Sequence, residues 1–257
     1  MIKAAFFDVD GTLLSHKSKQ VPPSARAALD ALKAAGIPCI VATGRQISEM
    51  EKLPIADIPF DGYITLNGQL LLDGEKKLIS ATPITGKVKE YLVECYESHK
   101  FPALIVEERR AYLNFVNDHV RATQAAISSG IPELAHYSGG EIYQFCAYLC
   151  PGEEHLVAPV AGACVMTRWN FGGLDIIAPG GGKVTGIRKY LDRYGLKPEE
   201  IIAFGDGEND LEMLRFAGIG VAMGNAEAAV REAADYVTAD IDDDGIAKAL
   251  RHFELIE

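Results

Sequence analysis

Two aspartates stand two residues apart near the start of the chain, directly behind a short apolar run. Asp8 and Asp10 follow residues 4–7, which have the composition of a buried strand. Side chains alternate between faces in extended backbone, so both carboxylates should point to one side, and Gly11 lets the chain turn sharply after them. Two like charges so close need a counter-cation. Mg²⁺ suits carboxylates combined with phosphate oxygens, whereas Zn²⁺ favours His or Cys. The pattern predicts a phosphoryl-transfer site, with a capped helix N-terminus as the alternative.

Three further segments carry side chains that fit such a site. Thr43 follows the apolar run 36–42, and its hydroxyl can donate to a phosphoryl oxygen. Asp206 follows residues 201–204 and can complete a cation site. Lys183 stands at the start of an amphipathic stretch, where the helix dipole already favours anions, and its ammonium would neutralise charge on the nucleophile and the phosphoryl group. Because parallel strands end at one edge of a sheet, we expect these groups to converge.

Alternating helical and strand patterns predict the scaffold that positions them. The expected helices are residues 23–35, 183–194, 211–217, 226–234 and 246–253, and the expected strands are 4–7, 36–42, 201–204, 219–222 and 236–238. Such alternation is typical of a parallel sheet covered by helices on both faces. The fold class we predict is α/β, with a Rossmann-like doubly wound parallel sheet as the core.

The pattern changes in the middle of the chain and predicts an inserted α+β domain at residues 83–179, between core segments 1–82 and 180–257. Its expected helices are 88–98, 119–128 and a short one at 153–159, and its expected strands are 103–107, 111–115, 142–149, 163–167 and 174–177. Loops rich in Pro or Gly stand at both ends of the insert and can act as hinges.

Four of these motifs, in this order, resemble those of the haloacid dehalogenase superfamily. They are residues 8–13, residues 43–45, Lys183 and residues 205–210. Three further segments resemble the Cof-type (subclass IIB) sugar-phosphatase-like branch: Asn67 with Gly68, residues 222–226 and residues 243–247.

The resemblance implies a Mg²⁺-dependent phosphatase that works through an aspartyl-phosphate on Asp8. The catalytic residues it implies are Asp8, Asp10, Thr43 and Lys183. The substrate-binding residues it implies are Thr43, Gly44, Arg45, Asn67, Lys183 and Asn209. Asp8, Asp10 through its backbone carbonyl, and Asp206 would hold the metal, while Asp210 would orient Lys183 or a metal-bound water. The inserted domain would be the cap that closes over the active site and selects the substrate.

The substrates we expect are small phosphorylated metabolites, with sugar phosphates first and FMN, pyridoxal phosphate or nucleotides behind them. Asp10 favours phosphate esters, because family members that break carbon–halogen bonds or pump ions lack an acid at that position. Two alternatives stay open. A sugar phosphomutase would share the aspartyl-phosphate and differ in its acceptor, and a non-catalytic phosphosugar-binding protein would bind without turnover.

Composition narrows the partners further. The 257 residues include 25 basic and 36 acidic side chains, a net charge of −11, with no cluster of Lys and Arg dense enough to follow a nucleic-acid backbone. We expect no nucleic-acid polymer and no membrane as partner, and a monomer or small homo-oligomer. A cytoplasmic location is expected because no signal-peptide pattern precedes the first strand and the odd number of cysteines suggests reduced thiols. The cysteines are Cys39, Cys95, Cys146, Cys150 and Cys164.

Overall fold

Strand β1 (Ala4–Phe7) is buried on both faces, and its side chains alternate between two apolar clusters. Ala5 and Phe7 join the cluster that includes helices α1 (Pro23–Ala34) and α8 (Gly245–His252), while Ala4 and Phe6 join the cluster of α5 (Lys183–Tyr194) and α6 (Leu211–Phe216). A strand covered by helices on both sides reads as a continuous apolar run, which explains its sequence.

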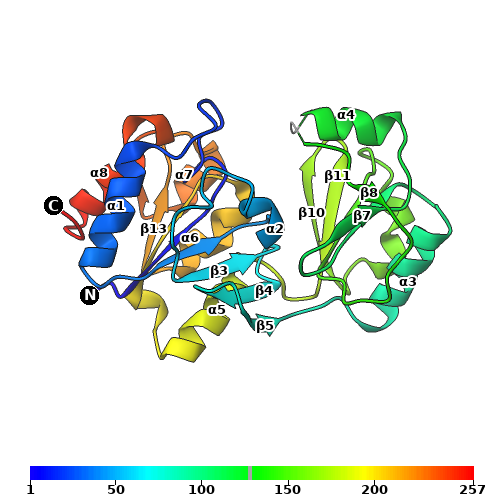
Figure 1. The fold of residues 1–257 in the computed structure, drawn as a ribbon, viewed down its shortest axis with the longest axis horizontal. Helices are drawn as coiled ribbons and strands as arrows, with labels where there is room; N and C mark the ends of the chain where they lie inside the picture. The colour runs from blue at the N-terminus through cyan, green and yellow to red at the C-terminus, as the bar shows by residue number, and fades with distance from the viewer. Residues whose placement is uncertain (127–128) are drawn as a thin grey trace. The chain divides into compact units, whose positions relative to one another are not determined.

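The computed structural model describes residues 1–126 and 129–257, and the chain divides into two compact units. The core unit comprises Met1–Ser80 and Gly182–Glu257, and the inserted unit is Ala81–Gly181 (Figure 1). The core sheet has eight strands, in the order β14 (Tyr236–Val237), β13 (Ile219–Ala222), β12 (Ile201–Gly205), β1, β2 (Cys39–Ala42), β3 (Gly62–Thr65), β4 (Leu70–Asp73) and β5 (Leu78–Ala81).

The strands from β14 to β3 are parallel to their neighbours, and β4 is antiparallel to β3. The expected α/β core with a Rossmann-like doubly wound parallel sheet is confirmed for the strands from β14 to β3. The antiparallel edge was not expected. It forms because Leu66, Asn67 and Gly68 all have positive φ, which reverses the chain within four residues and returns β4 beside β3.

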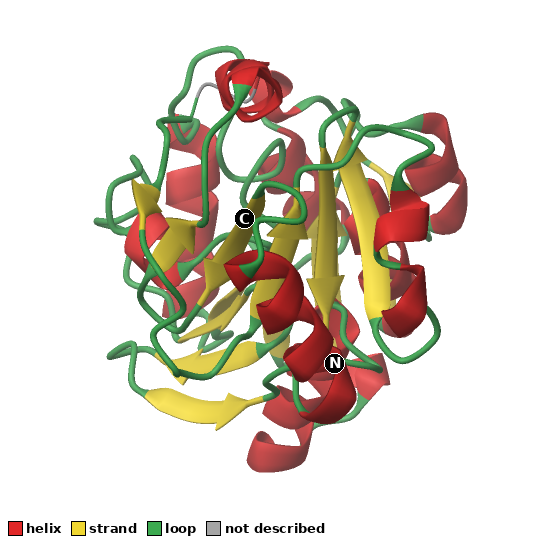
Figure 2. Ribbon diagram, turned by 90° about the vertical axis from the view of Figure 1, so that its right-hand side faces the viewer, coloured by secondary structure: helices red, strands yellow, loops and turns green. Residues whose placement is uncertain are grey.

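Helices of the core unit supply both apolar clusters that cover its sheet, and Figure 2 distinguishes the helices of the chain from its strands by colour. Helix α1 begins with Pro in its first turn and is followed by Gly36 at a φ of 76°. Proline is favoured at the start of a helix and glycine just after its end, so the sequence defines both ends of α1. The remaining helical elements of this unit are α2 (Ile47–Met50), α7 (Ala228–Ala233) and 3₁₀ turns at Pro198–Glu200, Glu208–Asp210 and Ile241–Asp243.

The inserted unit is an α+β structure with its own apolar core. Its six-stranded sheet has the order β10 (Val165–Asn170), β11 (Gly173–Ile177), β9 (Gln144–Ala147), β6 (Ala103–Val106), β7 (Ala111–Leu113) and β8 (Glu133–Leu134). Helix α3 (Gly86–Glu97) supplies Val88, Leu92 and Tyr96 to the core beneath this sheet.

Beyond the helix at 88–98, the sequence predicts two helices in the inserted unit. Helix α4 (Asp118–Ala126) covers most of the expected helix 119–128, whose last two residues lie outside the described part of the chain. The single helix expected at 153–159 is replaced by two 3₁₀ turns, Glu154–Leu156 and Ala158–Val160. Pro159 has no backbone N–H, so an α-helix cannot continue through it with full hydrogen bonding. Among the residues described, no helix is long and apolar enough to cross a bilayer.

Candidate active site

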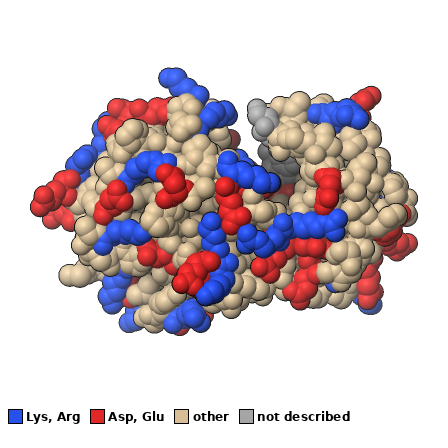
Figure 3. Space-filling view, viewed as in Figure 1, with Lys and Arg blue, Asp and Glu red and all other residues tan. Residues whose placement is uncertain are grey.

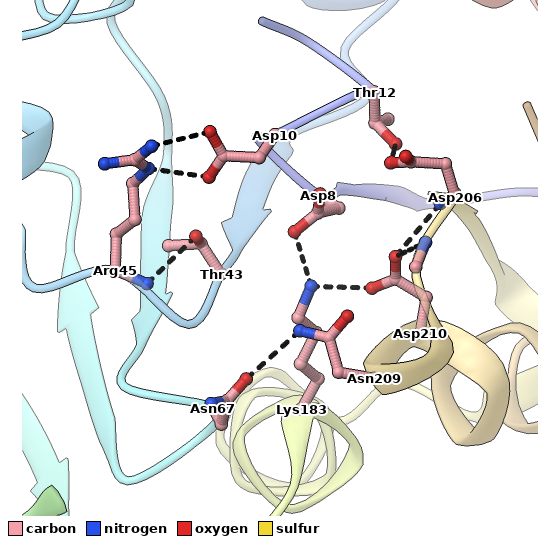
Figure 4. Close-up of polar contacts among 11 residues, drawn as sticks. Asp8, Asp10, Thr12, Thr43, Arg45, Asn67, Lys183, Asp206, Asn209 and Asp210 are labelled. Atoms are coloured by element: carbon pink, nitrogen blue, oxygen red, sulfur yellow. Dashed lines mark hydrogen bonds and ion pairs between the residues drawn. The ribbon is translucent and has the colours of Figure 1, made fainter. Parts of the chain in front are cut away.

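The carboxyl ends of neighbouring parallel strands bring the predicted site residues together. Asp8 follows β1, Thr43 follows β2 and Asp206 follows β12, while Lys183 is the first residue of α5. Figure 4 shows their side chains converging, joined by Asp10, Arg45, Asn67 and residues of the turn after β12. All of these residues belong to the core unit.

Lys183 is the buried centre of the site. Its side chain is 1% exposed, and its ammonium forms ion pairs with Asp8 and with Asp210, the latter at 2.6 Å. Burial alone would lower the pKa of Lys183, but the charges of Asp210 and Asp8 outweigh burial and raise it, so the group stays protonated. The other oxygen of Asp210 accepts the backbone N–H groups of Asp206 and Gly207, at 3.0 and 2.9 Å. Asp210 is therefore held by the backbone and in turn holds Lys183.

Three carboxylates share this site with a single ammonium. Asp8, Asp206 and Asp210 each offer an oxygen within 4.8 Å of the others. Burial raises the pKa of Asp8 well above its ordinary value, with Asp210 and Asp206 adding to the rise and Lys183 offsetting part of it. Burial likewise raises the pKa of Asp206 to about 6. Excess negative charge on hard oxygen ligands fits a divalent cation such as Mg²⁺.

The Asp206 carboxylate is held by residues that sequence reasoning did not place in the site. Thr12 donates its hydroxyl to Asp206 Oδ1 at 2.8 Å, and Asn225 donates its amide to Asp206 Oδ2 at 3.4 Å and to the Gly11 carbonyl at 2.9 Å. Gly11 has a φ of 86°, and a Cβ there would overlap the Asp206 carboxylate. Thr12 and Asn225 both lie in the motifs noted above, which is the signal that could have identified them.

Asp10 lies apart from the three-carboxylate cluster. Both of its side-chain oxygens accept hydrogen bonds from Arg45, at 2.6 Å from Nε and 2.8 Å from Nη2. This bond to Asp10 is the main reason why the pKa of Arg45 rises. The carboxylate of Asp10 is thus engaged away from the cluster, which suits the expectation that only its backbone carbonyl would meet a metal.

Asn67 lies beside the other two predicted residues, Gly44 and Asn209. Asn67, at a φ of 53°, accepts a hydrogen bond from Asn209 Nδ2 at 3.3 Å, and its carbonyl accepts the N–H of Gly182 at 3.0 Å, directly before α5. A Cβ on Gly44 would lie 3.2 Å from the Asn67 amide. The Gly44 position therefore leaves room for the Asn67 side chain.

The chain is similar to known proteins over nearly its whole length. Residues 5–250 match the model of a family described as haloacid dehalogenase-like hydrolase. YkrA of Bacillus subtilis is 31% identical over 99% of both chains, and the pyridoxal phosphate phosphatase YbhA of Escherichia coli is 29% identical over 94% of both. The solved structure of BT4131, described as a subclass IIB sugar phosphatase, is 38% identical, with a TM-score of 0.84 over 99% of this chain and 100% of that one.

The family match covers nearly the whole chain, and the structural match includes both units. The resemblance inferred from the four motifs is thereby confirmed. This chain belongs to the haloacid dehalogenase-like hydrolases and is similar to their Cof-type, subclass IIB members.

Proposed function

We propose that this protein is a Mg²⁺-dependent phosphatase that hydrolyses small phosphorylated metabolites, sugar phosphates first, through an aspartyl-phosphate on Asp8. The observation that carries the proposal is the buried ion pair between Asp8 and Lys183 inside a cluster of three carboxylates. A carboxylate nucleophile beside a fixed ammonium is the arrangement that attack on a phosphate dianion requires.

In the first step, an oxygen of Asp8 attacks phosphorus in line, and the bond from phosphorus to the substrate alcohol breaks. Lys183 stays protonated and offsets the charge on the nucleophile and the phosphoryl group. The Thr43 hydroxyl and the Asn209 amide donate to phosphoryl oxygens. Mg²⁺, when bound by Asp8, Asp206 and the backbone carbonyl of Asp10, supplies a Lewis acid that screens the nucleophile from the phosphate.

Asp10 serves both steps as the proton-transfer group. It protonates the alcohol oxygen as it leaves and then removes a proton from the water that attacks the aspartyl-phosphate, which releases inorganic phosphate and restores Asp8. Asp210 acts through Lys183, because its two oxygens are occupied by that ammonium and by backbone N–H groups.

Small substrates are supported by the relatives named above, one described as a sugar phosphatase and one as a pyridoxal phosphate phosphatase. We assign residues 83–179 the role of the cap that selects among them. On the face drawn in Figure 3, acidic and basic side chains lie interspersed, which fits a small-molecule substrate better than a nucleic-acid polymer. All five cysteines are free thiols, which fits the reducing cytoplasm.

A panel of phosphorylated metabolites tests the proposal. The wild type and Asp8→Asn should be compared with MgCl₂ and with chelator, measuring both free phosphate and isomerised sugar phosphate. We expect phosphate release that needs Mg²⁺ and disappears in the variant. Isomer without phosphate would identify a mutase, and ligand binding with neither product would identify a binding protein. Either result would overturn the proposal.

A further inference from the structure

We propose that Arg45 is the positioning residue of Asp10: it holds the carboxylate that transfers protons, instead of binding the phosphoryl group of the substrate. The inference rests on the proposed function, in which Asp10 is the acid and base. It replaces the substrate-binding role that the sequence motif suggested for Arg45.

The contact between the two side chains defines the orientation of the carboxylate. Arg45 donates from Nε to Oδ2 and from Nη2 to Oδ1, at 2.6 and 2.8 Å. Two parallel hydrogen bonds from a planar guanidinium fix the plane of a carboxylate as well as its position. Each carboxylate oxygen has two lone-pair sites, so each keeps one that can carry or receive a proton.

Hydrogen bonds also fix the backbone of Arg45, which carries the guanidinium. The N–H of Arg45 donates to the Thr43 hydroxyl at 3.1 Å, and its carbonyl accepts the N–H of Leu66 at 3.2 Å. The strand end that carries Thr43 thus also sets the position of Arg45. The side chains of Arg45 and Asp10 are 35% and 31% exposed, so the pair is open enough for a substrate oxygen to reach Asp10.

The same pair leaves Arg45 poorly placed as a phosphate ligand. The edge formed by Nε and Nη2, one of the edges with which Arg grips a phosphate bidentately, is already occupied by Asp10. Lys183, in contrast, lies in the cluster with the nucleophile. Phosphate charge is therefore met by Lys183, and Arg45 serves the proton-transfer group.

The two roles differ in how the loss of Arg45 depends on the leaving group. A general acid matters most when the leaving oxygen is strongly basic, as in a sugar phosphate, and little when it departs as a stable anion, as in p-nitrophenyl phosphate. A phosphate ligand matters equally for both, because their phosphoryl groups are the same. The value of kcat/KM reports the step in which the leaving group departs, so it is the quantity to compare.

The experiment measures kcat/KM for Arg45→Gln and Arg45→Lys with glucose 6-phosphate and with p-nitrophenyl phosphate. For both variants we expect a loss of about 10- to 100-fold with the sugar phosphate and less than about threefold with the aryl phosphate. Lysine keeps the charge but not the planar fork, so it should not restore the sugar-phosphate activity. Activity on the aryl phosphate also shows that each variant is folded.

Two controls calibrate this result. Arg26 also makes a bidentate contact, from Nη1 and Nη2 to the two carboxylate oxygens of Asp57, with both bonds at 3.0 Å. This pair is not among the residues of the candidate site, so Arg26→Lys should leave both kcat/KM values unchanged. Asp10→Asn should give the same preference for the aryl phosphate as Arg45→Gln. Combining Asp10→Asn with Arg45→Gln should add little, because both changes disable one unit.

Equal losses with both substrates would overturn the inference and restore phosphate binding by Arg45. Additive losses in the double variant would also overturn it. A wild type that releases phosphate from neither substrate would instead show that the proposed function has failed, and the inference would fall with it.

Discussion

Asp206→Asn should stabilise the metal-free protein at alkaline pH, although it removes a group that the proposed reaction needs. Burial raises the pKa of Asp206 from its ordinary value of 3.8 to about 6, so ionised Asp206 is disfavoured in the folded state. The stability that protonated Asp206 contributes to the folded state is fully present below pH 3.8 and is lost as the pH rises through about 6. Asparagine carries no charge at any of these pH values and escapes this loss.

The magnitude follows from the two pKa values. A rise from 3.8 to about 6, at about 1.4 kcal/mol for each factor of ten in proton affinity, is a penalty of about 3 kcal/mol above pH 7. About 1 kcal/mol of this penalty is already present near pH 4.5. The free energy of unfolding of Asp206→Asn, relative to that of the wild type, should therefore rise by about 2 kcal/mol between about pH 4.5 and about pH 8. Changes in hydrogen bonding to Thr12 or Asn225 that do not vary with pH cancel in this difference.

Urea unfolding with chelator at both pH values measures the free energies of unfolding of wild type and variant. Asp57→Asn is the matched control with the opposite sign, because the hydrogen bond from Arg26 lowers the pKa of Asp57 and its ionised form is the stabilising one. Saturating MgCl₂ at about pH 8 should reverse the order, because only the wild type keeps the full ligand set. A variant whose disadvantage is constant or grows with pH would refute this reasoning.

Two further variants test the residues around the cluster. Lys183→Met should lower the free energy of unfolding of the metal-free protein by about 3–5 kcal/mol in urea, because Asp8 and Asp210 would stay buried without their ammonium. Lys248→Met, which removes the cation of an exposed ion pair, should lower the free energy of unfolding by under about 1 kcal/mol. Equal losses of stability in the two variants would contradict the role of burial. Asn225→Ala should weaken Mg²⁺ binding about tenfold in a thermal-shift titration, because Asp206 and the Gly11 carbonyl lose a shared donor, and unchanged affinity would show that Asn225 is not needed.

Local sequence patterns predicted the site residues that lie at the end of a single strand or at the start of a single helix. Asp8 and Asp206 each follow an apolar strand, and Lys183 begins an amphipathic helix. The few residues around each of these side chains were therefore enough to predict where it lies on its strand or helix. The rule that parallel strands end at one edge then predicted that these groups meet.

Pairings between distant segments could not be predicted in the same way. Arg45 and Asp10 are 35 residues apart, and Asn225 and Gly11 are 214 apart, so no local spacing reports their contact. The hairpin from β3 to β4 depends on a positive φ at Leu66. Leucine rarely adopts a positive φ, so residue propensities did not predict this hairpin.

The most direct test of the account asks whether phosphate becomes bonded to Asp8. Wild-type protein should be mixed with Mg²⁺ and a sugar phosphate that it hydrolyses, quenched in acid within milliseconds, and analysed by peptide mass spectrometry. Because acid preserves acyl phosphates, we expect one phosphoryl group on the peptide that contains Asp8. We expect neither adduct nor turnover in Asp8→Asn, a nearly isosteric change that should retain the fold. Phosphate release by Asp8→Asn at the wild-type rate, or a phosphoryl group on another residue, would contradict the account.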